Sequence, residues 1–239
     1  MTLQRYVSDE LTHFVGRGLR ALPEGEERQY ALLVNILRGG QLGTDKTKHI
    51  VYTDASKFSE NEYYKPNMVC FSDIPVPDLA IHMAKFSRFG LAFKKSFLVA
   101  KGANPVFYLP REAQIETSPG RQVDLASHFD QRHQMILSLF RNLPTMGDGD
   151  MPSLAPSLTN QQVNDLLSFL IYHFFSLCKF YDAGLAADDP ANYYMEREWR
   201  VFGRLDFDLQ QVSRVIFPER FAMRFRDDLP EYYGEIIFS

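Results

Sequence analysis

The sequence lacks most of the features that mark a secreted or membrane-bound protein. Only two cysteines occur in 239 residues, Cys70 and Cys178, and each lies in an apolar run. This usage predicts buried free thiols in a reducing compartment. The N-terminus has no apolar signal stretch, and the longest apolar segment, Leu166 to Cys178, is shorter than the ~20 residues of a membrane helix. We therefore expect a cytoplasmic protein with no membrane partner.

Several common catalytic motifs are also missing. The six histidines form no i, i+4 pair and no cluster of acidic residues accompanies them, so we expect no metal site. The glycines from Gly39 to Gly43 follow a predicted helix, whereas a phosphate-binding loop precedes one. No Walker-type lysine and no Gly-x-Ser-x-Gly elbow is present. The sequence gives no ground for ATP chemistry of that class or for a covalent hydrolase.

Composition indicates an ordinary globular chain. Hydrophobic residues make up 45% of it, which is enough for a substantial core, and the net charge of −4 argues against coating nucleic acid by charge alone. We expect a single domain over residues 1–239. Within it we distinguish an N-terminal sheet portion (1–110), a helical insertion (111–190) and C-terminal strands (191–239).

The hydrophobic pattern predicts an α+β fold in which the first and last portions share one mixed sheet. Polar stretches at Thr44–Lys65 and Pro144–Pro156 are predicted to be loops, the first of them on the surface. Helices are predicted over Glu27–Arg38, from Pro77 or Asp78, over Asp124–Arg141, and from a capping box at Thr159. Strands are predicted at Leu11–Val15, Met68–Phe71, Phe89–Phe93, Phe97–Val99, Val106–Leu109, Glu198–Gly203, Val212–Phe217 and Tyr232–Phe238.

The segment Glu196-Arg197-Glu198-Trp199 carries the most chemistry. On a strand, Glu196 and Glu198 would share one face, while Trp199, the only tryptophan, would point to the other. Such paired acids indicate either a site or the solvated side of an edge strand. A carboxylate can stabilise positive charge that develops at a ribose carbon.

Two earlier strands supply groups that suit the same chemistry. His13 lies on the first predicted strand and could hydrogen-bond a ribose hydroxyl or an amide. Phe71 and Ser72 end the middle strand, where an aromatic ring could stack on a flat ring. Taken alone, His13 fits a plain structural histidine better than a ligand-binding one.

Three blocks of the sequence resemble the AbiGi family of abortive-infection proteins. They are Tyr6–Gly16, the long block Val69–Leu109 and Glu196–Val201. The resemblance implies a role in bacterial defence against phage in a two-component arrangement. It also implies an antitoxin whose cognate partner is a nucleotidyltransferase-like toxin.

The order of these blocks is similar, more remotely, to DarT-like ADP-ribosyltransferases. That similarity implies a mainly antiparallel sheet of their type with NAD as substrate and nucleic acid or protein as acceptor. Glu198 would be the catalytic acid, supported by Glu196. NAD would be held by His13, Thr12, Phe71 and Ser72.

The chain departs from the DarT-like pattern in two ways. Phe71 lacks the hydroxyl of the usual tyrosine, and the family's arginine has four competing positions: Arg5, Arg17, Arg20 and Arg38. Two functions therefore stay open. One is an active ADP-ribosyltransferase in phage defence, and the other is an inactive antitoxin or sensor that acts on a partner toxin.

Overall fold

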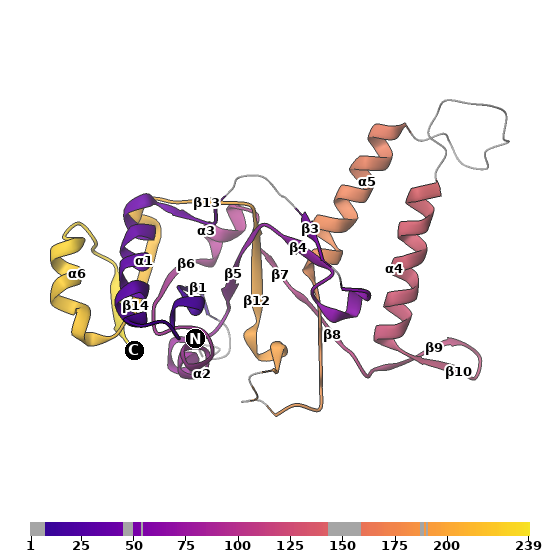
Figure 1. Cartoon of the computed structure of the whole chain (residues 1–239), viewed down its shortest axis with the longest axis horizontal. Coiled ribbons are helices and arrows are strands. Elements are labelled where there is room, and N and C mark those ends of the chain that lie inside the picture. Colours follow the sequence, from indigo (N-terminus) through magenta and orange to yellow (C-terminus); the bar gives the residue numbers. More distant parts are fainter. Residues whose placement is uncertain (1–7, 45–49, 54, 143–158, 187–188, 190) are drawn as a thin grey trace, which may run out of the picture. The chain divides into compact units, whose positions relative to one another are not determined.

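The structure is a computed structural model that describes residues 8–44, 50–53, 55–142, 159–186, 189 and 191–239. The chain divides into two compact units (Figure 1). The first comprises Met1–His49, Asn67–Val106 and Leu185–Ser239, and the second comprises Ile50–Pro66 and Phe107–Gly184. The assignment of residues 1–239 to a single domain stays a prediction.

A seven-stranded sheet forms the centre of the first unit. Its strands are drawn from both ends of the unit, in the order β15-β14-β6-β1-β5-β12-β7. All neighbouring strands are antiparallel except β14 and β15, so the predicted α+β class and the mixed, mainly antiparallel sheet are confirmed. The bounds are β1 Glu10–Phe14, β5 Met68–Ser72, β6 Gly90–Lys94, β7 Asn104–Pro105, β12 Glu198–Phe202, β14 Val212–Phe217 and β15 Glu235–Phe238.

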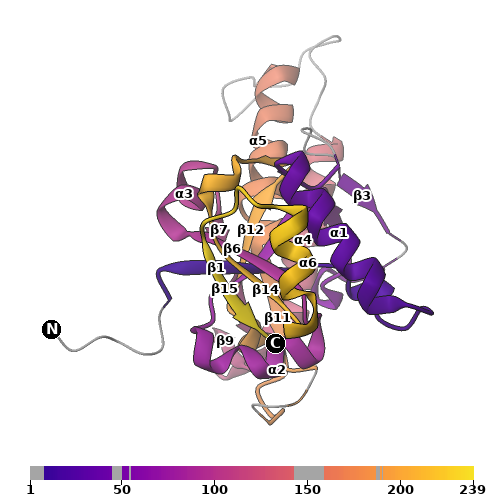
Figure 2. The same ribbon diagram turned by 90° about the vertical axis from the view of Figure 1, so that its left-hand side faces the viewer.

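One face of this sheet carries the main hydrophobic core. Helices α1 (Gly25–Gly39) and α6 (Ala222–Asp228) contribute buried side chains to it and lie next to each other (Figure 2). We call it the apolar face. It is lined by Leu11, Phe71, Leu91, Phe93, Val201 and Val215.

The opposite face of the sheet is polar in its centre. Side chains alternate between faces along a strand, and directly paired residues share a face. The register therefore places six polar side chains together, which we call the polar face: Glu10, Thr12, Ser72, Glu198, Arg200 and Arg214. An ion pair of 2.8 Å between Arg214 and Glu10 agrees with this assignment.

Helix α1 shows how closely the apolar spacing matches the structure. The predicted helix begins two residues earlier, at Gly25, and buries Tyr30, Leu33, Val34 and Leu37. Gly40 ends it with a φ of 61°, and a Cβ there would lie 2.5 Å from the carbonyl oxygen of Phe207. Only glycine fits both conditions.

One of the shorter elements of the first unit differs from its predicted secondary structure. Phe97–Val99 was predicted as a strand, but it belongs to α3 (Lys95–Ala100). The prediction was wrong because an apolar run this short is too short for its periodicity to distinguish a helix from a strand. The predicted helix after Pro77 is confirmed as α2 (Leu79–Lys85). The other elements are β2 Gln41–Leu42, β13 Leu205–Asp206, and 3-10 helices η1 Arg17–Leu19, η3 Val76–Asp78, η5 Tyr193–Glu196, η6 Leu209–Gln211 and η7 Glu219–Phe221.

The second unit is built from two helices and small two-stranded sheets. Helix α4 (Leu125–Asn142) is confirmed, and α5 (Asn160–His173) begins at the predicted capping box of Thr159. The apolar segment Leu166 to Cys178 is not one helix, because α5 ends at His173 and Cys178 begins strand β11. The strands are β3 Ile50–Tyr52, β4 Tyr64–Pro66, β8 Phe107–Pro110, β9 Gln114–Ser118, β10 Arg121–Asp124 and β11 Cys178–Tyr181, with η2 Phe58–Glu60 and η4 Phe175–Leu177.

The surface-loop prediction for Thr44–Lys65 is wrong over its described part. Phe58 and Tyr64 are buried in the core of the second unit, where their rings pack around His133. The predicted loop Pro144–Pro156 lies outside the described residues. Across the described chain, no helix combines the length and the apolar character needed to cross a membrane.

Candidate functional site

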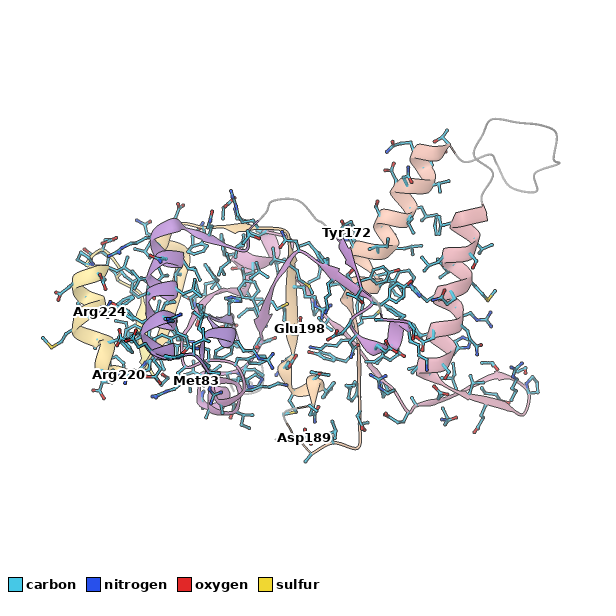
Figure 3. The ribbon with its side chains drawn as sticks, viewed as in Figure 1. Met83, Tyr172, Asp189, Glu198, Arg220 and Arg224 are labelled. Atoms are coloured by element: carbon cyan, nitrogen blue, oxygen red, sulfur yellow. The ribbon has the colours of Figure 1, made fainter. Side chains whose placement is uncertain are left out.

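Three predicted site residues lie in a row on the polar face. Thr12 on β1 pairs with Ser72 on β5, and Ser72 pairs in turn with Glu198 on β12. Figure 3 labels Glu198 on this strand. Adjacent strands are ~4.8 Å apart, so these two hydroxyls and the carboxylate follow one another across three strands. All three residues are buried. The sequence placed them in one site, and the structure brings them together.

Glu198 is engaged in an ion pair within its own strand. The Nε atom of Arg200 donates a 2.7 Å hydrogen bond to its Oε1 atom, and the two side chains are 11% and 9% exposed. Residues two apart on a strand share a face, so the spacing Glu198-x-Arg200 was a readable signal that the sequence analysis missed. The carboxylate is therefore held and charge-compensated before any ligand arrives.

Glu196 does not share the strand with Glu198. It ends the 3-10 helix η5, and Arg197 between the two acids has a left-handed backbone with a φ of 44°. This turn separates the two carboxylates, so the predicted common strand face is wrong. Glu196 instead pairs with Lys85 of α2 at 2.8 Å, and both side chains are nearly buried. Nothing in the sequence pattern indicated Lys85.

His13 and Phe71 lie on the other side of the sheet. They neighbour Thr12 and Ser72 in sequence, so strand alternation turns both toward the apolar face. The centres of their rings are 5.7 Å apart and the ring planes are tilted relative to each other. Phe71 is only 1% exposed. His13 therefore lies on the opposite face of the sheet from Glu198, with which the DarT-like resemblance places it at one NAD molecule.

The environment of His13 is that of a structural histidine. Its Nδ1 atom lies 2.8 Å from the carbonyl oxygen of Cys70, to which it donates a hydrogen bond when protonated. Burial lowers the pKa of His13, and the hydrogen bond to Cys70 opposes that shift only in part. The imidazole is thus neutral near pH 7 and anchors β1 to β5.

Three of the four arginines that compete for the DarT-like position lie in the described part of the chain, and each contacts a group outside this row. Arg17 lies over the ring of Phe86, Arg20 bonds the carbonyl of Ala84, and Arg38 pairs with Asp228. Arg5 lies outside the described residues. Arg200 is the arginine that contacts Glu198.

A further group of oppositely charged side chains lies at the end of β5. The carboxylate of Asp73 accepts a 2.9 Å hydrogen bond from Lys95 and lies 3.7 Å from Arg197. The amide of Asp73 also donates to the carbonyl of Arg197, at 3.1 Å. Together with the pairs of Glu196 and Glu198, these contacts fix both ends of the Glu-Arg-Glu turn. Among the described residues, no three His, Cys, Asp or Glu side chains come together as metal ligands.

The fold and the site define an α+β protein whose central sheet has one apolar face and one polar face. The side chains of the polar face form ion pairs. A family model described as "Putative abortive phage resistance protein AbiGi, antitoxin" matches residues 44–229. The chain belongs to the AbiGi family. Membership indicates a role in phage resistance and, by the family's description, as an antitoxin.

The match includes the turn from Glu196 to Glu198 and the end of β5, but not Thr12 or His13. No curated protein matches the chain, and neither does any solved structure. The resemblance to DarT-like ADP-ribosyltransferases and the identity of the sheet with theirs stay predictions.

Proposed function

We propose that the chain is the antitoxin of a two-component phage-defence system and that it acts by binding a partner toxin. The family description supports the antitoxin role. The observation that carries the proposal is the separation of His13 from Glu198 on opposite faces of the sheet. The DarT-like arrangement expected from the sequence would need both groups at one substrate.

The ion pairs of the two glutamates support the same proposal. Glu198 is held by Arg200 and Glu196 by Lys85, each within 3 Å and each nearly buried. A carboxylate that must stabilise transient positive charge loses much of that capacity beside a fixed cation. These pairs instead give the turn a rigid shape, which suits a binding role.

The proposal is tested by growth in cells. The product of the neighbouring gene is expressed alone, with the wild-type chain, and with a Glu198→Gln variant of the chain. We expect the neighbour alone to arrest growth and both forms of the chain to restore it. Arrest by this chain alone, relieved by Glu198→Gln, would overturn the antitoxin role.

The row of Thr12, Ser72 and Glu198 favours a second candidate, an NAD-dependent ADP-ribosyltransferase. The two hydroxyls and the carboxylate can hydrogen-bond ribose hydroxyls from one face of the sheet. In this proposal Glu198 is the catalytic acid and Glu196 supports it, while nucleic acid or protein is the acceptor. His13 and Phe71 do not fit the proposal, because they lie behind the sheet.

This second candidate has its own test. The chain is incubated with NAD labelled in the nicotinamide ring, with single-stranded DNA, RNA or protein extract as acceptor. Release of nicotinamide by the wild type and its loss in Glu198→Gln would support the enzyme. Absence of release under every condition, including extract of phage-infected cells, would remove it.

A further inference from the structure

The turn that leads into β12 exposes three large side chains in succession. Tyr193, Tyr194 and Met195 of η5 are 38%, 50% and 37% exposed. Tyrosine, methionine and arginine are enriched where proteins bind one another, and tyrosine is frequent among the residues that dominate binding energy. These three side chains make the turn a candidate surface for protein binding.

Helix α2 holds this turn in place. The ring of His82 lies with its Nε2 atom 3.1 Å from the carbonyl oxygen of Met195. Lys85 forms its ion pair with Glu196 and places its ammonium 5.1 Å from the centre of the Tyr193 ring. A turn that is ordered before binding loses less conformational freedom when a partner docks.

The same helix extends the surface and supplies its charge. Ile81 is 51% exposed and lies one turn before Lys85 on α2. Two exposed arginines lie at the end of the helix, where Arg17 covers the ring of Phe86 and Arg20 bonds the carbonyl of Ala84. The aromatic-turn surface consists of Ile81, Tyr193, Tyr194 and Met195, with Arg17 and Arg20 at its rim.

We propose that the aromatic-turn surface binds the partner toxin, at an apolar pocket of the toxin that has an acidic rim. The inference rests on the proposed antitoxin function and names the surface that performs it. Arginines beside an apolar patch complement acidic groups around the pocket and speed the encounter. A second copy of this chain fits less well, because the aromatic-turn surface as defined contains two arginines and no carboxylate that could pair with them.

The test measures binding of the purified neighbouring-gene product by titration calorimetry. Tyr194→Ala and Met195→Ala remove exposed side chains, and the Met195 carbonyl that His82 contacts remains. We expect the double variant to bind at least about ten-fold more weakly than the wild type. Matched controls are Tyr233→Ala and Met223→Ala, whose side chains are 90% and 84% exposed on other elements. The controls should bind within about two-fold of the wild type.

The outcomes separate this inference from the function beneath it. If the wild-type chain neutralises no neighbouring product, the antitoxin proposal fails. If the wild type neutralises and binds it while the turn variants bind as the controls do, only the proposed surface is wrong. The surface is equally wrong if the turn variants abolish a dimer of this chain, or binding to a single-stranded oligonucleotide, and leave toxin binding intact.

Discussion

The Nε atom of Arg200 donates a 2.7 Å hydrogen bond to the carboxylate of Glu198, and both side chains are about nine-tenths buried on the polar face. This pair links the two residues that matter most for any account of the site. It neutralises the carboxylate, fixes its position beside Ser72, and depends on both partners being charged. Buried pairs of this kind are costly to break from one side.

Removing the cation should therefore destabilise the fold strongly. We expect Arg200→Met to lower the free energy of unfolding by about 3 kcal/mol, because the buried carboxylate of Glu198 loses the cation that pairs with it. Arg220→Met is the matched control, since Arg220 pairs with Glu26 at the surface with its own side chain 60% exposed. The control should cost less than about 1 kcal/mol in the same urea titration. If both variants lower the free energy of unfolding equally, the buried pair contributes no more to stability than the exposed pair.

The left-handed backbone of Arg197 gives a second prediction. A φ of 44° suits glycine and is unfavourable for a β-branched residue. We expect Arg197→Val to destabilise the fold by about 1–2 kcal/mol and Arg197→Gly by less, since glycine adopts a positive φ without strain. If the Arg197→Gly variant unfolds at a lower temperature than the Arg197→Val variant, the turn does not have this conformation.

The buried His133 should make stability depend on pH. Burial lowers its pKa to about 4 from the ordinary 6.5, so on acidification the unfolded chain takes up the proton first. The stabilisation is complete above pH 6.5 and declines as the pH falls toward 4, by about 3 kcal/mol in total. Urea titrations at pH 7.5 and pH 4.5 measure the difference.

A paired variant isolates this histidine. Its Nε2 atom lies 2.7 Å from the hydroxyl of Tyr64, so Tyr64→Phe with His133→Phe removes both polar partners together. We expect the pH dependence to become shallower in this variant and to persist in part, because burial also lowers the pKa of His13 and of His82. His128→Phe on the same helix serves as the control. An unchanged slope in the paired variant would show that His133 is not responsible.

The fold could be predicted from sequence where the apolar period was long or bounded by clear stops. The stripe of α1 followed by Gly40, and the strand ending at Ser72, are of that kind. The segment Phe97–Val99 was predicted wrongly because three apolar residues fit a helix and a strand equally. The polar composition around Phe58 hid a core contact with His133, which is remote in sequence.

The site was predictable to a similar degree. The order of the strands brings Thr12, Ser72 and Glu198 into one row, and their role in binding or catalysis stays a prediction. Strand alternation alone puts neighbouring residues on opposite faces, but which of them shares the face of Glu198 was not predictable, because that depends on a register that a sequence does not display. His13 is adjacent to Thr12 and is for that reason on the opposite face. The ion pair of Lys85 with Glu196 was not predictable either, because the two residues are far apart in sequence and only the tertiary structure brings them together.

The growth experiment with the neighbouring gene tests the central claim most directly. Cells express that gene's product alone, or together with the wild-type chain, the Glu198→Gln variant or the Tyr194→Ala/Met195→Ala variant, with equal levels of folded chain confirmed for each. We predict that the wild type and Glu198→Gln restore growth and that the turn variant does not. Arrest of growth by the wild-type chain on its own, abolished by Glu198→Gln, would contradict the account and show that the chain is the toxic enzyme.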